Sequence, residues 1–525
     1  MHYEYPECMC NFNKMTAWDP QMVFQSSRHK RPHSVGLASR YLQNLRRRDF
    51  LSGAALVDGQ WVSGGERDPV IDPATGEEIA DVARCGAAGM EVAIAAAERS
   101  FPMWRELLPA RRGAILRSWA SLMIEHEEEL AILVTSEQGK PLAEARQEIA
   151  YGAGFLEWFA AEGERAYGET IPSHKLGSLL HVRMQPVGVA AAITPWNFPI
   201  AMITRKAGAA LAAGCPIIVK PAPETPLSAM ALARLAEQAG LPRGVFQVLV
   251  GNPIELSTPL LSDTRIRALS FTGSTGVGRL LLEGAAESVK KVSLELGGHA
   301  PFLVFDDVDL EKAVKGAMVA KFATSGQDCL AANRIYVQRS IYGAFVEQFA
   351  AGIAQLRIGH GLEATTDIGP MTKLSVADKC RSHIDDAVKK GARVVSPQQD
   401  ASLGPNFVPP TLLSDVTENM LIAREETFGP VAAVLPFDSE EEVIARANSS
   451  EMGLAGYVYT DNLRRAMRLS ERIECGMLGI NTASFTGPPI PFGGWKQSGL
   501  GREGSRHGLA EFMELKYVCF GDLAA

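Results

Sequence analysis

The sequence predicts an α/β fold with two parallel sheets and a small additional β element. Short apolar segments of strand length alternate with helix-length segments from residue 181 to residue 296, and a second alternation begins at residue 301. This alternation is typical of parallel, doubly wound sheets. The chain has 525 residues, too many for one hydrophobic core, so two or three domains are expected.

The composition excludes several classes of protein. Hydrophobic residues make up 46% and charged residues 21%, as in ordinary globular proteins. The formal net charge of −8 disfavours nucleic acid as a partner, because a phosphate-binding surface needs a basic excess. No apolar run approaches the ~18–20 residues of a membrane span. We therefore expect neither nucleic acid nor a membrane among the partners.

The cysteines indicate a reducing compartment, and we expect the cytoplasm. Eight cysteines are scattered over the whole length, too few for a disulfide scaffold in a chain of this size. Cys8 and Cys10 lack the second pair of ligands that a zinc site would need, so no metal is expected.

The N-terminal region is expected to lie outside the folded part of the chain. Residues 1–37 are polar and without periodicity, so we expect a disordered extension or a misassigned start, with Met15 and Met22 as alternative starts. Residues 46–51 read RRRDFL, which resembles a twin-arginine export motif. Asp58 and Gln60 interrupt the sequence before an apolar segment can form, so a basic surface patch is the preferred interpretation.

Two long helices are expected before the alternation. Residues 55–79 have the composition of short strands around a turn at 72–76. The first helix covers 110–138, where Gly139 and Pro141 stop it. The second covers 142–167, with its aromatic residues in the core: Tyr151, Phe155, Trp158 and Phe159.

The first alternation predicts a parallel sheet that ends near Gly298. The expected strands are 181–193, 216–220, 244–250, 266–271 and 291–296, and the expected helices are 200–214, 227–240, 254–262 and 277–286. The second alternation has strands at 301–305, 334–337, 431–437, 456–459 and 477–481, with helices at 310–324 and 341–356. The final strand, ELKYVCF, is marginal by itself and is expected to join another sheet, of this chain or of another subunit.

Three separated stretches contain the parts needed for acyl transfer through a thioester. Cys329 lies in FATSGQDCLAANR, Glu295 lies in the apolar LELGG, and Asn197 lies between prolines in PWNFP. A lone cysteine is more often a small buried hydrophobic residue. A thiol, a carboxylate and a side-chain amide together supply a nucleophile, a base and an oxyanion donor.

A dinucleotide site is indicated by a glycine-rich turn. Gly273 and Ser274 lie where a strand ends and a helix begins, and such turns bind pyrophosphate at the helix N-terminus. Lys220 ends a neighbouring strand and would face the same crevice, although a solvated lysine is the plain alternative. Glu426 and Phe428, in EETFGP, could hold a ribose and pack on a ring, or form a turn with a core phenylalanine.

With these stretches in order, the chain resembles the aldehyde dehydrogenase superfamily over residues 55–523. The motifs are PWNFP, FTGST, LELGG, GQDC, EETFGP and PFGGWKQSG. Within the superfamily it is most similar to the succinate-semialdehyde dehydrogenases, on ITPWNFPIAMITRKAGAALAAGC, SGLGREGSRHG and ELKYVCFG.

The resemblance implies a fold and a division into domains. A Rossmann-like NAD(P)-binding domain would comprise residues 52–168 and 190–297, and a second α/β domain, the catalytic one, residues 298–482. A small β oligomerisation element would comprise 169–189 and 503–525, so a homo-oligomer, dimer or tetramer, is expected.

The resemblance also implies roles for individual residues. Cys329 attacks the aldehyde, Asn197 and the Cys329 N–H hold the oxyanion, and Glu295 activates water. The cofactor, NAD or NADP, would be held by Ile193, Thr194, Pro195, Trp196, Lys220, Pro223, Gly273, Ser274, Glu426 and Phe428. The substrate would be held by Arg205, Asp328, Thr486 and Phe492.

Four positions depart from the nearest relatives. Pro223 replaces the carboxylate that binds ribose in NAD-preferring members, so both cofactors are expected to be accepted. Ala323 replaces the second arginine for a distal carboxylate. Asp328 stands where threonine is usual; it could pair with Arg205 or Lys321, raise the pKa of Cys329, or favour a hydroxyl-bearing or cationic substrate. Ala331 excludes a redox disulfide with Cys329.

The expected function is oxidation of a short-chain aldehyde to the acid, with succinate semialdehyde as the first candidate. The alternative is another small polar aldehyde of the hydroxy-, sulfo- or amino class. A hypothesis from a different functional class is a non-catalytic binding protein of the same fold. The joint retention of Cys329, Glu295 and Asn197 argues against it.

Overall fold

The computed structural model describes residues 36–396 and 403–523. From Leu37 onward the chain forms one compact unit. The expectations for residues 1–35, including Cys8, Cys10, Met15 and Met22, lie outside the described residues. The arginine-rich stretch leads into the short helix η3 (Arg48–Leu51), in which Phe50 is buried. Arg47, which precedes the helix, pairs with Asp49 at 2.8 Å.

The first sheet has eight strands in the order β2-β1-β9-β8-β7-β10-β11-β21. The strands β9, β8, β7, β10 and β11 are parallel. The chain adds strands on one side of β7 and then on the other, so the switch point lies between β7 and β10. In open parallel sheets, ligands bind beside such a switch point, at the carboxyl ends of the strands. The bounds are β1 Ala55–Val57, β2 Gln60–Val62, β7 Val189–Ile193, β8 Ile217–Lys220, β9 Phe246–Val248, β10 Ile266–Thr272, β11 Lys291–Glu295 and β21 Gly499–Leu500.

The register brings predicted site residues to one edge of this sheet. Ile193 pairs with Lys220 on one side and with Phe271 on the other, and Thr272 pairs with Glu295. The four strands end at Ile193, Lys220, Thr272 and Glu295, so the chain segments that follow them leave the sheet at the same edge. The position of the dinucleotide crevice therefore follows from strand length and register.

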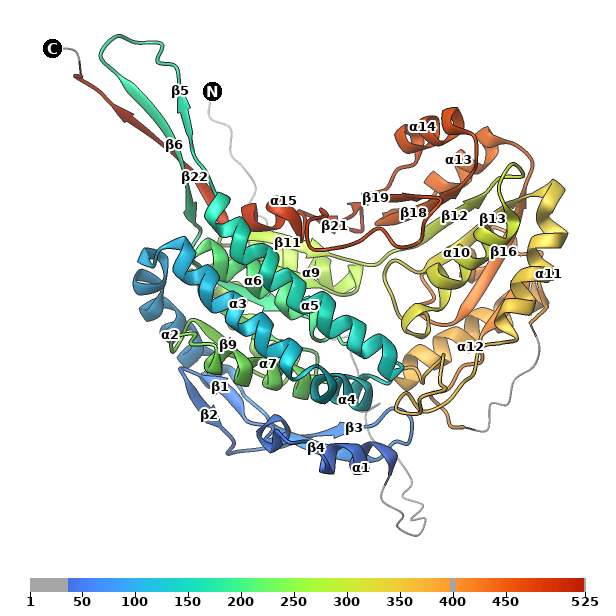
Figure 1. Ribbon diagram of the computed structural model, residues 1–525, viewed down its shortest axis with the longest axis horizontal. Helices are drawn as coiled ribbons and strands as arrows, with labels where there is room; N and C mark the ends of the chain where they lie inside the picture. Colours follow the sequence, from blue (N-terminus) through green and yellow to red (C-terminus); the bar gives the residue numbers. More distant parts are fainter. Residues whose placement is uncertain (1–35, 397–402, 524–525) are drawn as a thin grey trace, which may run out of the picture. The chain divides into compact units, whose positions relative to one another are not determined.

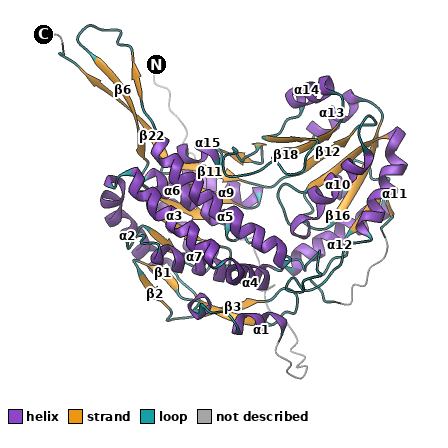
Figure 2. Cartoon of the chain, viewed as in Figure 1, coloured by secondary structure: helices purple, strands orange, loops and turns teal. Residues whose placement is uncertain are grey.

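Helices cover both faces of this sheet (Figure 2). The predicted helix 110–138 is wrong as a single element, because His126 takes φ −105° and ψ 20° and divides it in two. The helix α2, at residues 87–106, was not predicted. The bounds are α1 Leu37–Gln43, α2 Ala87–Glu106, α3 Pro109–Glu125, α4 Glu127–Gln138, α5 Leu142–Glu162, α6 Ala201–Ala213, α7 Pro226–Gln238, α8 Pro253–Ser262 and α9 Thr275–Ala286.

The predicted strand 181–193 is also two elements. Its first half belongs to β6 (Leu179–Pro186), which joins a different sheet from β7. Gly188 separates the two with φ +134°, and a Cβ there would lie 2.6 Å from Cγ of Arg267. The break depends on this left-handed glycine and on the close approach of β10, neither of which is visible as an interruption in hydrophobicity.

The second sheet has seven strands in the order β14-β15-β16-β13-β12-β18-β19. All neighbours except β14 and β15 pair in parallel. The bounds are β12 Ala300–Val304, β13 Ala332–Gln338, β14 Arg393–Val394, β15 Thr411–Ser414, β16 Val431–Phe437, β18 Ala455–Tyr459 and β19 Met477–Ile480, with helices α10 Leu310–Phe322, α11 Tyr342–Ile353, α12 Leu374–Lys389, α13 Glu440–Asn448 and α14 Leu463–Arg472.

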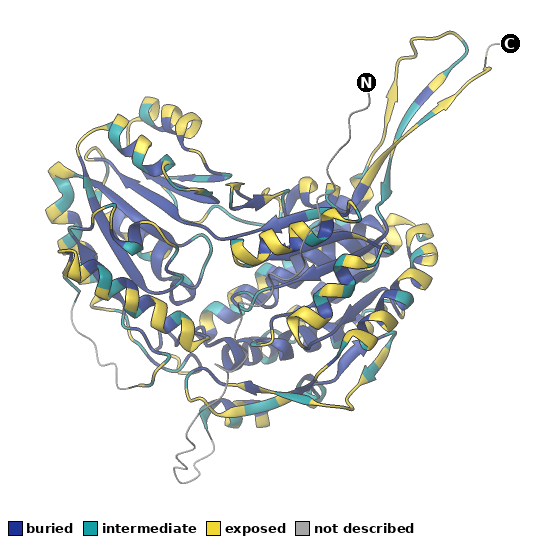
Figure 3. Ribbon diagram, turned by 180° about the vertical axis from the view of Figure 1, so that it is seen from behind, coloured by how far each residue is buried: buried dark blue, intermediate teal, exposed yellow. Residues whose placement is uncertain are grey.

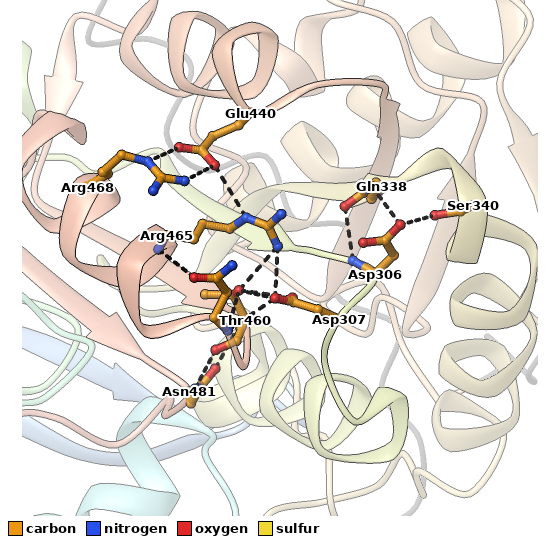
Figure 4. A network of polar contacts seen from close by, with 10 residues as sticks. Asp306, Asp307, Gln338, Ser340, Glu440, Thr460, Arg465, Arg468 and Asn481 are labelled. Atoms are coloured by element: carbon orange, nitrogen blue, oxygen red, sulfur yellow. Dashed lines mark hydrogen bonds and ion pairs between the residues drawn. The ribbon is translucent and has the colours of Figure 1, made fainter.

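A polar network covers the carboxyl edge of the second sheet (Figure 4). Arg465 pairs with Asp307 at 3.0 Å and with Glu440 at 3.3 Å, and Thr460 bonds Asp307 at 2.8–2.9 Å. These side chains use one another as partners. Cys329 lies at the opposite, amino-terminal edge, three residues before β13 begins.

A small sheet joins the C-terminal strand to the middle of the chain. Strand β22 (Met513–Phe520) pairs antiparallel with β6 over its whole length, and β6 pairs with β5 (Glu169–Ile171). This sheet extends beyond the helices that cover the first sheet (Figure 1), and its residues are largely exposed (Figure 3). The terminal strand thus joins another sheet, as expected, and that sheet is its own chain's. None of the described helices combines the length and apolar character needed to cross a bilayer.

A left-handed turn connects α10 to the cysteine. Thr324, Ser325 and Gly326 have φ of 51°, 56° and 74°, so the helix predicted to run to residue 324 ends at Phe322. The carboxylate of Glu144 accepts from the Thr324 N–H at 3.0 and 2.9 Å, and the Ser325 hydroxyl accepts from the Gly369 N–H at 2.9 Å. These bonds hold the turn from two different parts of the chain.

Gly326→Ala should destabilise the protein. The residue has positive φ, and a Cβ would lie 2.4 Å from the backbone carbon of Gly429. We expect a loss of about 1–3 kcal/mol in the free energy of unfolding, measured by urea denaturation. The matched control is Gly343→Ala in α11, where a Cβ has no neighbour within 4 Å and where alanine should be neutral or slightly stabilising. Equal effects of the two changes would contradict this account.

Candidate active site

Two cavities meet at Cys329. Cavity 1 has a volume of about 350 Å³ and lies between α5, α6 and the segment that precedes β13. Cavity 2 has a volume of about 310 Å³ and lies at the switch-point edge of the first sheet. Among the described residues, Cys329 alone lines both cavities. A thiol in this position can contact a ligand in either one.

The Cys329 thiol is held in its neutral form. The side chain is half-buried, and burial raises its pKa well above the ordinary value. The charges of Asp328 and Glu426 raise the pKa further, while Arg205 lowers it. A thiol is a weak nucleophile until it ionises, so groups in the two cavities must promote its deprotonation.

Asn197 is buried beside the cysteine loop. Its Nδ2 donates to the carbonyl of Gln327 at 3.1 Å, and its Oδ1 has no hydrogen-bond partner within the described chain. An amide nitrogen carries two hydrogens, so one remains for a ligand in cavity 2, which Asn197 lines. Gln327 precedes Cys329 by two positions, so this bond fixes the amide against the segment that contains the nucleophile.

Glu295 ends β11 and is only 2% exposed. Neither carboxylate oxygen has a hydrogen-bond partner among residues 36–396 and 403–523, and the residue lines neither cavity. Burial and the nearby Glu503 raise its pKa well above the usual range, against the opposing effect of Arg205 and Lys206. Burial therefore favours the neutral form of this carboxyl group in this conformation.

A buried ion cluster that the sequence did not reveal lies next to Glu295. Glu503 pairs with Arg205 at 2.8 Å and with Lys206, whose Nζ also donates to Thr272 at 2.7 Å and to Ser270 at 3.1 Å. All are buried. The one sequence signal was the adjacent pair Arg205 and Lys206 in an otherwise apolar helix, since buried cations require a partner.

The four predicted substrate residues come together in cavity 1: Arg205, Asp328, Thr486 and Phe492. The Arg205 guanidinium lies 4.1 Å from the centre of the Phe492 ring. The suggested pairing of Asp328 with Arg205 or Lys321 is not seen. Arg205 pairs with Glu503, and Lys321 Nζ has no hydrogen-bond partner among the described residues.

The predicted cofactor residues divide into two groups. Pro195, Trp196, Gly273, Ser274, Glu426 and Phe428 line cavity 2. Ile193, Thr194, Lys220 and Pro223 do not line it. Burial lowers the pKa of Lys220 to about 8, its Nζ donates to the carbonyl of Pro221 at 3.1 Å, and Pro223 is exposed. Ser375, Val376 and Lys379 of α12 also line cavity 2 and had no signal in the sequence.

The residues of cavity 2 fit a dinucleotide. Helix α9 begins at the cavity, and its N-cap Ser274 accepts from the Val277 N–H at 3.4 Å, which leaves the first N–H groups directed toward a phosphate. Trp196 and Phe428 meet edge to face with ring centres 5.5 Å apart. Glu426 accepts from the Gly298 N–H at 3.0 Å, and burial raises its pKa to about 7.

Comparisons with known proteins assign the family. Residues 61–518 match the aldehyde dehydrogenase family. The chain belongs to this family. It is 51% identical over 469 residues to the NADP(+) succinate-semialdehyde dehydrogenase of Escherichia coli strain K12, covering 89% of this chain and 97% of that protein. It is 53% identical over 473 residues to a non-phosphorylating aspartate-semialdehyde dehydrogenase of Halomonas elongata, covering 90% and 96%.

A solved structure agrees with the fold. The crystal structure of an Escherichia coli NADP-dependent enzyme is 50% identical to this chain, with a TM-score of 0.90 over 91% of this chain and all of the other. The family, the fold class and the enzyme class inferred from the sequence motifs are confirmed. So is the cofactor type, since members of the family use NAD or NADP.

The labelling rate of Cys329 with iodoacetamide should keep rising with pH after that of N-acetylcysteine has levelled off. The reason is the raised pKa of the thiol, because only the thiolate reacts. The measurement is mass spectrometry of the Cys329 peptide in the cofactor-free protein at a series of pH values. A plateau at lower pH than that of N-acetylcysteine would contradict the electrostatic account.

Proposed function

We propose that the protein oxidises a short-chain aldehyde to its carboxylic acid through a thioester on Cys329. The observation that carries this proposal is the meeting of two cavities at that thiol. One cavity then holds the aldehyde and the other the nicotinamide end of the cofactor. Succinate semialdehyde is the first candidate substrate, and another small polar aldehyde is the alternative.

The reaction begins with attack of the Cys329 thiolate on the aldehyde carbon. The oxygen that becomes negative accepts hydrogen bonds from the Asn197 amide and the Cys329 backbone N–H. A nicotinamide cofactor held by the residues of cavity 2 would supply the acceptor for the hydride that leaves the sulfur-bound carbon, and that carbon then becomes a thioester. Glu295 then removes a proton from water, which attacks the thioester and releases the acid and the thiol. This role requires the Glu295 side chain to turn toward Cys329.

The substrate class is supported by the residues of cavity 1 and by the named relatives. Those relatives are dehydrogenases for succinate semialdehyde and aspartate semialdehyde. Arg205 and Thr486 offer a cation and a hydroxyl to a polar tail. Ala323 lines the same cavity and supplies no second cation, so a simple anionic tail has weaker support than the family resemblance alone would give.

Acceptance of both cofactors is supported by the region after β8. Pro223 supplies no carboxylate, and the neighbouring Glu224 pairs with Lys373 at 2.5 Å. A carboxylate that is held by a lysine repels a 2′-phosphate less than a free one does. Lys220 is close enough to this pair for both charges to act on its pKa.

The surface of the small sheet supports a homo-oligomer. On one face, Leu515 and Tyr517 of β22 lie opposite Met184 and Val182 of β6. Leu515 and Tyr517 are 69% and 55% exposed. An exposed apolar sheet face is typical of a contact with another protein, and a second copy of this chain is the proposed partner. Analytical ultracentrifugation of Tyr517→Glu beside the wild type tests it, and an unchanged mass would contradict it.

The division into domains and the compartment also remain proposals. We propose residues 52–168 and 190–297 as the NAD(P)-binding domain, 298–482 as the catalytic domain, and 169–189 with 503–525 as the oligomerisation element. A cytoplasmic location is supported by the low cysteine content and by the free state of the six described cysteines. Fractionation of the source cells would test the location.

Cys329→Ala should abolish turnover, because no other group supplies the thioester. Asn197→Ala should lower kcat by about 10²–10³, the cost of one lost oxyanion donor. Both variants should still bind NADP, as followed by quenching of tryptophan fluorescence. Surviving activity in the first variant would remove the mechanism. A near wild-type kcat in the second would remove the role of Asn197.

Initial rates at equal concentrations of NAD and NADP should lie within about tenfold of each other. Lys373→Ala should lower the rate with NADP relative to NAD, because it frees the Glu224 carboxylate. The control is Lys312→Ala, an exposed lysine of α10, which should leave the ratio unchanged. Turnover with one cofactor only, or the same ratio in both variants, would contradict the proposal.

A further inference from the structure

Cavity 1 contains two carboxylates without an ionic partner. Asp328 and Glu144 both line it, and neither forms an ion pair within residues 36–396 and 403–523. Asp328 accepts the Leu330 N–H at 2.9 Å and bonds the Cys329 thiol, and Glu144 accepts the Thr324 N–H. The third carboxylate of the cavity, Glu148, is neutralised by the buried Lys140 at 2.6 Å.

The same cavity has one cationic side chain. Arg205 lines the cavity and also forms an ion pair with Glu503. Glu503 also pairs with Lys206, so the cluster of two cations and one carboxylate keeps a positive charge for a ligand. A tail that carries only a carboxylate would find this cation, but it would leave the carboxyl groups of Asp328 and Glu144 without an ionic partner. Burial raises the pKa of both groups, that of Glu144 to about 7, so a nearby cation is needed to favour their charged forms. A tail that carries only a cation would leave the positive cluster unused.

We propose that the aldehyde taken by cavity 1 bears both an ammonium group and a carboxylate, as an amino acid semialdehyde does. The ammonium group contacts Asp328 and Glu144, and the carboxylate contacts Arg205. This inference rests on the proposed oxidation of an aldehyde at Cys329 and specifies the class of its substrate. The proposal accounts for two departures from the nearest relatives, since Asp328 adds a carboxylate and Ala323 replaces an arginine.

The arrangement has a consequence for the nucleophile. Asp328 directly precedes Cys329, and its negative charge opposes formation of the thiolate. An ammonium group bound at Asp328 offsets that repulsion at short range, where Coulomb interactions are strong. The preferred substrate therefore promotes ionisation of the thiol that attacks it. A substrate with a carboxylate alone adds a further negative charge near the same thiol.

The test compares kcat/KM for three aldehydes: aspartate semialdehyde, succinate semialdehyde and 3-aminopropanal. The first has both charged groups, the second only the carboxylate, and the third only the ammonium group. We expect aspartate semialdehyde to exceed each of the others by at least about tenfold, since a site built for a polar group discriminates against its absence. A preference for succinate semialdehyde or 3-aminopropanal would overturn the inference.

Variants at position 328 test whether Asp328 causes the preference for aspartate semialdehyde. Asp328→Asn should lower kcat/KM for aspartate semialdehyde by about tenfold or more and raise it for succinate semialdehyde. Asp328→Glu keeps the charge and should keep the substrate order. Glu311→Gln makes the same charge change at the exposed start of α10 and should alter neither value. Equal losses on both substrates in Asp328→Asn would overturn the inference.

The outcome also separates this inference from the function on which it rests. If the wild type oxidises succinate semialdehyde at least as well as aspartate semialdehyde, the inference fails and the proposed function stands. If it oxidises none of the three aldehydes with NAD or NADP, the proposed function fails and the inference fails with it.

Discussion

The left-handed turn at Thr324–Gly326 is the constraint on which the site depends. Two of its residues have side chains, and each costs about 1–2 kcal/mol in this backbone conformation. The Glu144 carboxylate accepts from the Thr324 N–H and the Ser325 hydroxyl accepts from the Gly369 N–H, and these bonds, with the packing of Gly326 against Gly429, offset that cost. Because the turn ends α10 abruptly, Cys329 leaves the helix axis and reaches the boundary between the two cavities.

Burial of charge is the second organising feature. Glu295, Cys329 and Glu426 all have pKa values raised by burial, so the free site holds fewer charges than its composition suggests. Arg205 and Lys206 act against this effect at Glu295, and Lys379 and Lys321 act against it at Glu426. The reaction then needs ligands that change the local field, and the cofactor and the substrate become part of the electrostatics that make Cys329 reactive.

The sequence predicted the strands and helices whose formation depends mainly on residues close together in the chain. The parallel strands were visible as short apolar runs, which placed Lys220 correctly at the end of one strand and Glu295 one residue before the predicted end of another. The breaks at His126 and Gly188 were missed because each depends on backbone angles and on a neighbouring element. Glu503 was missed because its partners are about 300 residues away in sequence, and the absence of Glu295 from both cavities depends on a side-chain conformation.

Strand β21 has a consequence for synthesis of the chain. It completes the first sheet beside β11, with Glu295 opposite Gly499, and the segment after it supplies Glu503 to the buried cations of α6. Roughly 200 residues separate β11 from β21, and a ribosome needs on the order of 10–40 s to add them. During that interval the nascent first sheet has an open edge and unpaired buried cations, so its final folding waits for the end of translation.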